Sequence, residues 1–137
     1  MTRITLASVL SAVAFAAAPG FVEAHHSGVM FEDKKEVTLQ GVVKEFQYTN
    51  PHSWLLVDVT NPDGSTTTWG FEAEGPSTML RNKIRPGDFL AGTKITITGH
   101  PMKDGRPAAL WIKALRADGV EFYPQGRPAQ DNARVSP

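Results

Sequence analysis

The stretch SWLLVDVTNPDGSTTTWGFEA, residues 53–73, decides the fold class. Residues 53–60 are rich in Leu and Val, and in residues 65–73 large apolar side chains alternate with small or polar ones, as in a half-buried strand. The Asn-Pro-Asp-Gly sequence at 61–64 favours a turn, because Pro fixes φ and Gly accepts a positive φ. The stretch therefore predicts a β-hairpin.

A longer strand is predicted before this hairpin, over residues 36–48. Its apolar residues lie on one face before Gly41, at Val37 and Leu39, and on the other face after it, at Phe46 and Tyr48. A change of face around a central glycine predicts a strand that bends or bulges to serve two sheets.

A short helix is predicted after the hairpin, in the stretch from Gly75 to Ile84. Gly75 and Ser77 are both candidates to cap it, and Met79, Leu80 and Ile84 are spaced to pack onto a barrel. Further strands are expected at 93–100, 108–117 and 120–123, separated by Gly-containing turns.

The predicted order is three strands, one helix, then two strands and a short sixth. This indicates an all-β fold with one short helix, an OB-fold-like barrel of five to six strands. A β-sandwich of Greek-key type is the alternative.

The first 24 residues have the features of a secretory signal. A positive start at Arg3 precedes an apolar run that is too short to span a membrane comfortably, and Pro19 and Gly20 end it. Cleavage after Ala24 is expected, an uncleaved anchor or a cut after Ala18 being the alternatives. The predicted organisation is a signal peptide at 1–24, a leader at 25–35, the barrel domain at 36–123 and a disordered tail at 124–137.

Composition limits the function classes. The 137 residues include 14 Lys plus Arg, 14 Asp plus Glu and no Cys, so the formal net charge is zero. Nucleic-acid binders usually carry an excess of Lys and Arg, so no nucleic-acid partner is expected. The lack of Cys excludes disulfides and thiolate sites. We expect an exported bacterial protein, periplasmic or secreted, without stable membrane insertion. Its expected partner is an unidentified periplasmic protein or small ligand, and an edge strand at the first or sixth position is a candidate for homodimer formation.

The four histidines are the candidate metal ligands. His25 and His26 stand at the predicted mature N-terminus, His52 opens the second strand, and His100 closes the fourth. In an OB-fold the loops next to these strand ends lie near the binding face, so His52 and His100 are candidates to complete a site. Histidines that cap turns or sit in a solvated leader are the alternative interpretation.

An N-terminal histidine offers its α-amine and its imidazole Nδ1 to one metal ion as a chelate. Cu(II) suits such a site, since it heads the divalent affinity order and prefers tetragonal nitrogen ligation. With His26 as second residue, its imidazole, the terminal amine and the intervening amide form another copper set. Copper is therefore the predicted cofactor, if the protein has one.

Three aromatic residues are candidates for an exposed ligand-binding face: Tyr48, Trp54 and Trp111. OB-folds stack bases or sugars on such residues, and core packing is the alternative role for each of them. No phosphate-binding loop and no nucleophile elbow is present, and no His pair has zinc-site spacing. The sequence therefore predicts a binding module without enzymatic activity.

Several motifs together resemble a family of small exported bacterial proteins catalogued as a domain of unknown function. They are Ala-His-His-Ser at 24–27, Thr-Asn-Pro-His-Ser-Trp at 49–54, Trp-Gly-Phe-Glu at 69–72, Arg-Pro-Gly-Asp at 85–88 and Thr-Gly-His-Pro at 98–101. The resemblance implies an exported, compact β-barrel and brings no activity. The segment 84–93 is longer than the family's usual form, which leaves the length of that loop open.

Overall fold

The computed structural model describes residues 27–129. It contains six strands, one short α-helix and two 3-10 helices: η1 (Ser27–Met30), β1 (Val37–Gln47), β2 (His52–Thr60), β3 (Thr66–Glu74), α1 (Pro76–Arg81), η2 (Pro86–Phe89), β4 (Lys94–Pro101), β5 (Ala108–Arg116) and β6 (Glu121–Phe122). Every strand expected from the sequence is present, with ends that differ by at most one residue.

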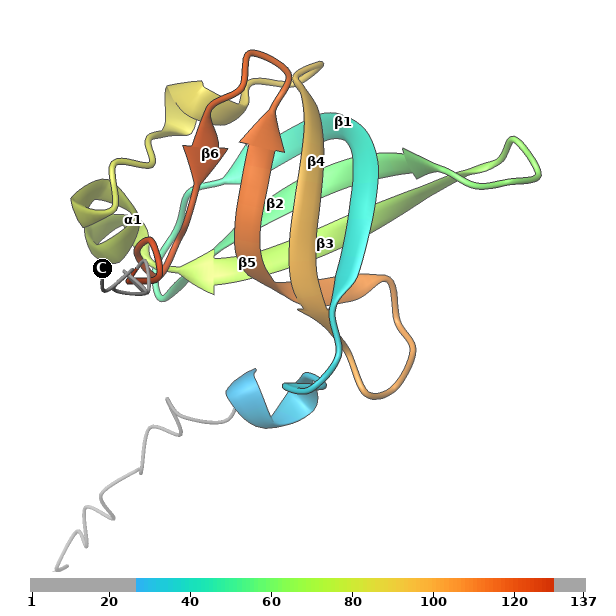
Figure 1. Cartoon of the computed structure of the whole chain (residues 1–137), viewed down its shortest axis with the longest axis horizontal. Helices are drawn as coiled ribbons and strands as arrows, with labels where there is room; N and C mark the ends of the chain where they lie inside the picture. The colour runs from blue at the N-terminus through green and yellow to red at the C-terminus, as the bar shows by residue number, and fades with distance from the viewer. Residues whose placement is uncertain (1–26, 130–137) are drawn as a thin grey trace, which may run out of the picture.

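Five of the strands close into a barrel (Figure 1). The sheet order is β3-β2-β1-β4-β5-β6, and a parallel pairing of β3 with β5 joins the two sides. This closure confirms the predicted OB-fold-like barrel and rules out the sandwich alternative, whose two sheets stay separate. It also places β1 between β2 and β4, so the first strand is not the edge that the sequence suggested.

Gly41 marks the bend in β1, as predicted. Up to Val42 the strand pairs with β4, and from Val42 onward it pairs with β2, with a shift of register between Val43 and Glu45. A Cβ on Gly41 would lie 2.6 Å from the carbonyl oxygen of Asp58. No side chain larger than the hydrogen of glycine fits here, because β2 passes directly beside this position.

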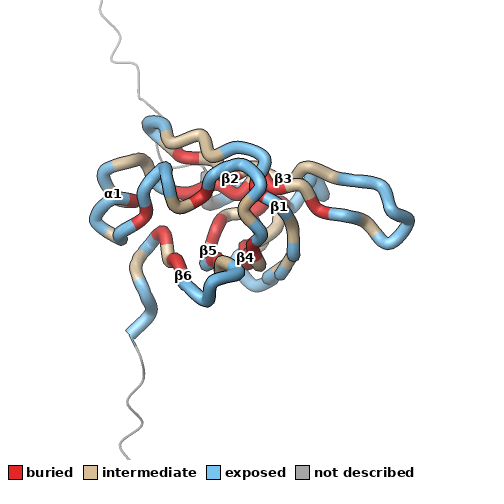
Figure 2. Tube along the Cα trace, turned by 90° about the horizontal axis from the view of Figure 1, so that it is seen from above, coloured by how far each residue is buried: buried red, intermediate tan, exposed pale blue. Residues whose placement is uncertain are grey.

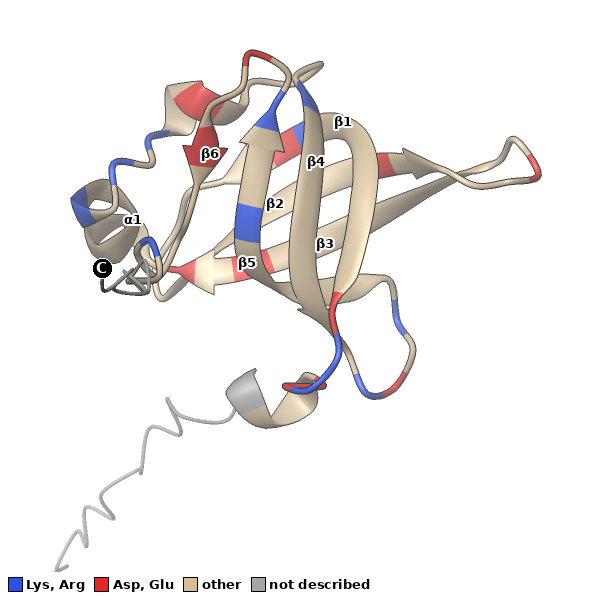
Figure 3. Ribbon diagram, viewed as in Figure 1, with Lys and Arg blue, Asp and Glu red and all other residues tan. Residues whose placement is uncertain are grey.

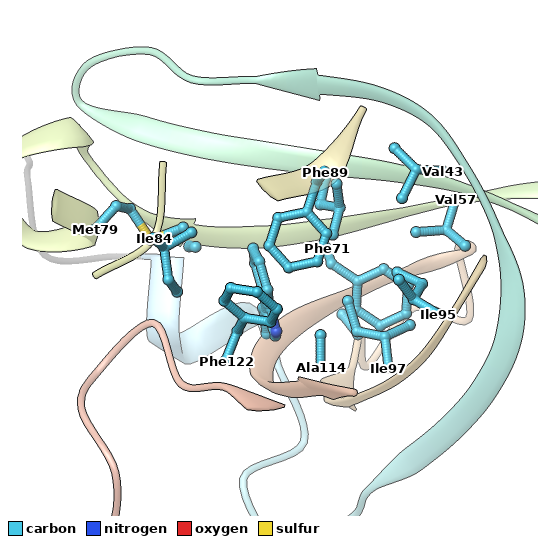
Figure 4. Close-up of a cluster of buried hydrophobic side chains, with 14 of the residues drawn as sticks. Val43, Val57, Phe71, Met79, Ile84, Phe89, Ile95, Ile97, Ala114 and Phe122 are labelled. Carbon is cyan, nitrogen blue, oxygen red and sulfur yellow. The ribbon is translucent and has the colours of Figure 1, made fainter. Parts of the chain in front are cut away.

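The core lies inside the barrel, where Figure 2 shows buried segments enclosed by exposed loops. Phe89, from η2, packs edge-on against Trp111 with ring centroids 5.2 Å apart, and it meets Phe122 of β6 at 4.7 Å (Figure 4). The segment 84–93 thus contributes the buried Ile84 and Phe89 rather than only a loop.

Helix α1 covers part of the same core. It starts after Gly75, which occupies the N-cap position, so of the two predicted caps Gly75 is the one used. Met79 is fully buried, whereas Leu80 is 55% exposed and does not pack onto the barrel as expected. With only six residues, the helix has one face in contact with the barrel and Leu80 falls outside it.

Both predicted boundary segments contribute to the ordered fold. In the leader, Phe31 is buried and forms an isolated bridge with Met102. Beyond residue 123, Pro124 is buried and its carbonyl accepts a hydrogen bond from Asn82 at 2.5 Å. The packed part of the chain therefore extends past the predicted start of the tail.

Candidate functional site

Two of the four candidate histidines fall within the described residues. His52 is the first residue of β2, and His100 is the penultimate residue of β4. His25 and His26 lie outside residues 27–129.

His52 contacts a buried carboxylate through its ring nitrogen Nδ1. Every second residue of β2 from Ser53 onward is buried, and β3 gives Phe71 and Ala73 to the core, so His52 and Glu72 lie on the opposite face of these strands. There Nδ1 of His52 meets Oε1 of Glu72, which is only 6% exposed. An ionised carboxylate only accepts hydrogen bonds, so Nδ1 is the donor in this contact, and in the neutral ring Nε2 is then the nitrogen with the lone pair.

From the sequence, Glu72 is one of several carboxylates expected to be solvated at the surface and is not a predicted site residue, although the hairpin contains the signal for its contact with His52. The tight turn sets the register, which pairs Thr60 with Thr66 and continues to His52 opposite Glu74. Counting outward from the turn places Glu72 one diagonal step from His52 on the same face. The partner of His52 was thus predictable from turn chemistry and register.

His100 has the same tautomer for a different reason. Its Nδ1 lies 2.6 Å from the backbone carbonyl oxygen of Lys35, which can only accept a hydrogen bond. Nδ1 therefore donates, and Nε2 is the nitrogen with the available lone pair. Donation from one ring nitrogen to a carbonyl or carboxylate is the arrangement that orients histidines which bind metals through the other nitrogen.

The two imidazoles do not converge on one position. His100 pairs with Leu110 on β5, Leu110 pairs with Glu72 on β3, and β2 with His52 lies one strand further. Three strand spacings of roughly 4.8 Å give about 14 Å between His100 and Trp54, which pairs with Glu72, and His52 lies two residues further along β2. Within residues 27–129 no group of three or more His, Asp or Glu side chains is placed to hold a metal ion. His52 and His100 therefore do not share a site formed by the barrel alone.

The leader attaches to the barrel at the end of β4. The amide of Glu32 donates to the carbonyl of Pro101, and the amide of Lys103 donates to the carbonyl of Met30, each at 2.9 Å. With Phe31 buried beside Met102, these bonds hold the start of the described chain at the same strand end as His100.

Of the three aromatic candidates, Trp54 alone lies on the outer face of β2. Its six-membered ring covers Gly70, where an added Cβ would lie 3.2 Å from Cε3 of the indole. Trp111 is 1% exposed, so its assignment to an exposed face is wrong. Like Ala109 two residues before it, Trp111 points into the barrel, and it packs against Phe89 in the core.

Tyr48 is half-buried and packs against the core. Its hydroxyl donates toward the carbonyl oxygens of Ile84 at 2.9 Å and Pro76 at 3.1 Å, and burial raises the pKa of this phenol. These bonds tie the end of β1 to the segment around α1, so the described role of Tyr48 is structural.

The charged residues and the groove on the described surface do not point to a particular ligand. Figure 3 shows acidic and basic residues distributed among the strands and loops rather than gathered on one element. An open groove of about 500 Å³ crosses β1, β4 and β5 next to Gln40, Thr96 and Leu115, and no histidine or tryptophan lines it. Among residues 27–129, no helix is both long and apolar enough to cross a membrane.

Comparison with known proteins gives one result. A family model described as "Family of unknown function (DUF6152)" matches residues 10–111. No curated protein and no solved structure matches the chain significantly.

Proposed function

This chain belongs to the DUF6152 family of unknown function, and we propose that it is an exported, non-enzymatic module that binds Cu(II) through a mature N-terminus beginning at His25. The proposed ligands are the α-amine and the Nδ1 of His25, together with a nitrogen from the imidazole of a second histidine. The unperturbed pKa values, near 8 for the amine and 6.5 for imidazole, make the proton cost of binding modest at neutral pH. Such a nitrogen set suits Cu(II) above other divalent ions.

The contact of His100 Nδ1 with the backbone carbonyl of Lys35 is the observation that carries this proposal. Its Nδ1 is held by the Lys35 carbonyl at 2.6 Å, which leaves Nε2 as a metal-binding nitrogen. Met30 and Glu32 of the leader are bonded to Lys103 and Pro101, close after His100, and in the sequence His25 and His26 precede Met30 by five and four positions. We assign His100 as the ligand that completes the copper site.

His52 also contacts its acceptor, Glu72, through Nδ1, but at this end of the barrel the strands β5 and β3 separate it from His100. Its role in this proposal is secondary, as a separate and weaker copper ligand. His52 therefore provides a matched control for His100, because both are oriented histidines on the same barrel.

The test is a Cu(II) titration of protein exported with its own signal, followed by electron paramagnetic resonance. Mass spectrometry should show a chain that begins at His25, and the spectra should show nitrogen hyperfine structure from one tight site. His25→Ala should abolish that site, His100→Ala should change the spectrum and weaken binding, and His52→Ala should leave both unchanged. A chain that begins elsewhere, or weak and heterogeneous copper binding, would exclude the proposal.

A second candidate function rests on the indole of Trp54, which lies against Gly70 on the outer face of β2 and β3. An indole on the outer face of a sheet can serve as a stacking platform for a small ligand, a glycan or a peptide side chain. Iodide should quench the fluorescence of Trp54, and Trp54→Phe should reduce the quenched component to the contribution of the partly buried Trp69, while the buried Trp111 stays protected. Complete protection of all indoles would exclude this function.

A further inference from the structure

The β2–β3 hairpin carries an unpaired strand edge. β3 pairs with β2 along its whole length, but on its other side it pairs with β5 only from Gly70 to Glu72. Thr66 to Trp69 therefore have no partner strand on that side within residues 27–129. Figure 1 shows this end of the hairpin projecting beyond the barrel, away from the other strands.

Two hydrogen bonds on either side of the unpaired part of β3 show which of its main-chain groups face this edge. Asn61 N–H donates to the carbonyl of Ser65 at 2.8 Å, and Gly70 N–H donates to the carbonyl of Pro107, before β5, at 3.0 Å. The N–H and C=O of one strand residue point to the same side, and neighbouring residues alternate. Ser65 thus faces the first arm of the hairpin, whereas Thr66 and Thr68 share the direction of Gly70 and face the open edge.

We propose that this edge pairs with the same edge of a second copy of the chain, antiparallel about a two-fold axis at Thr67. Thr66 of one copy then lies opposite Thr68 of the other, and the symmetry generates a second identical pair. Each of these is a hydrogen-bonded pair that exchanges two N–H···O bonds, so the contact forms about four hydrogen bonds. One surface serves both partners, as an isologous dimer requires.

The side chains of this edge favour a second copy as the partner. Monomeric proteins usually protect an exposed edge with Lys, Pro or a bulge, and the run Thr66-Thr67-Thr68-Trp69 has none of these. The run itself is uncharged, and the two charged side chains that contact Thr68, Lys44 and Asp58, are an ion pair of opposite sign, so self-pairing opposes no net like charge. Four residues per copy are far fewer than the roughly 20–30 of a stable interface, so the dimer is weak and forms at high protein concentration.

Cross-linking tests the register directly. The chain has no cysteine, so a disulfide in Thr67→Cys must join two copies. The Thr67 residues of the dimer form a non-hydrogen-bonded pair with Cα atoms about 4.5 Å apart, which suits a disulfide. Thr60→Cys is the matched control, because Thr60 lies on the opposite edge of the same hairpin. Thr67→Cys should form covalent dimer much faster than Thr60→Cys.

Sedimentation equilibrium of the folded protein gives the second test. Thr66→Pro removes an N–H that faces the open edge and no intrachain hydrogen bond, and Thr60→Pro makes the same change on the other edge. Thr66→Pro should raise the dimer dissociation constant about tenfold or more, since two of the four intermolecular bonds are lost, while Thr60→Pro leaves it unchanged.

Three outcomes would overturn the proposal. They are a chain that stays monomeric at millimolar concentration, equal effects of the two proline substitutions, and equal cross-linking rates of the two cysteine variants. If Thr66→Pro fails to fold, which circular dichroism detects, the cysteine pair alone decides. A dimer that forms without cross-linking at position 67 places the interface elsewhere and also contradicts the proposal.

Discussion

Replacing Gly41 by alanine tests whether the bend in β1 is what allows the barrel to close. At this residue the strand pairs with Ile95 of β4, and the next residue, Val42, is the first to pair with β2. An added Cβ would lie 2.6 Å from the carbonyl oxygen of Asp58 and 2.6 Å from Cγ1 of Val57. Both contacts are shorter than the 3.0 Å below which real Cβ contacts are essentially not found.

The expected cost follows from what would have to move. The Asp58 oxygen belongs to the backbone of β2, and Val57 is fully buried in the core, so neither can turn aside. Overpacking of this kind costs about 1–3 kcal/mol, and two simultaneous clashes place Gly41→Ala at about 2–3 kcal/mol. For a domain of about 100 residues this lowers Tm by about 10–20 °C.

The assay is reversible unfolding in urea and by heat, followed by far-ultraviolet circular dichroism. Gly87→Ala is the matched control, because a Cβ there would meet no heavy atom within 4 Å and Gly87 has no positive φ. Its free energy of unfolding should change by less than about 0.5 kcal/mol. If Gly41→Ala and Gly87→Ala have the same stability, the close approach of β1 to β2 does not constrain the barrel and this reasoning fails.

Three further predictions concern the core, the oriented histidine and the surface charges. Phe89→Ala should lower the free energy of unfolding by about 3–5 kcal/mol in urea titrations, because Phe89 is 1% exposed and fills the centre of the aromatic cluster. Glu72→Ala should move the ¹⁵N shifts of the His52 ring toward those of free histidine, because the acceptor that holds the proton on Nδ1 is lost; unchanged shifts would contradict the contact. The hydrogen bond from Arg116 lowers the pKa of Asp118, so this pair stabilises the fold fully above about pH 4 and its contribution is lost as the pH falls through the lowered folded value. Asp118→Asn should therefore lose less stability than wild type between pH 6 and pH 2 in thermal scans.

The barrel was predictable from the sequence because its determinants are local. The turn at 61–64 sets the register of the hairpin, and the change of face at Gly41 indicates one strand shared by two pairings. These signals depend on residues within a few positions of one another. The parallel pairing of Gly70 with Ala108, which closes the barrel, joins distant residues and followed only from the connectivity rule.

The candidate site was less predictable, since it depends on the direction of single side chains. Trp111 could equally have faced outward, because β5 has a register shift opposite Thr98 and Gly99 that breaks simple alternation. The partner of His100 is a backbone carbonyl in the leader, and no residue type signals that contact. The positions of histidines along a chain show which strand ends carry them, and only the packed structure shows which ring nitrogen remains available.

Both described histidines contact an oxygen acceptor through Nδ1, an arrangement that fits the proposed site and also fits histidines that act as turn caps. A cap needs only the bond that Nδ1 makes, and it predicts nothing about Nε2. A ligand needs Nε2 free and the ring held in place, and His100 meets both conditions through Lys35, at the strand end to which the leader is bonded. His52 meets them through Glu72, but β5 and β3 separate it from the strand end to which the leader is bonded. If the N-terminal nitrogens bind copper, comparing the copper affinities of His100→Ala and His52→Ala therefore shows whether a histidine of the barrel completes the site. Equal affinities would mean that the leader alone supplies the ligands.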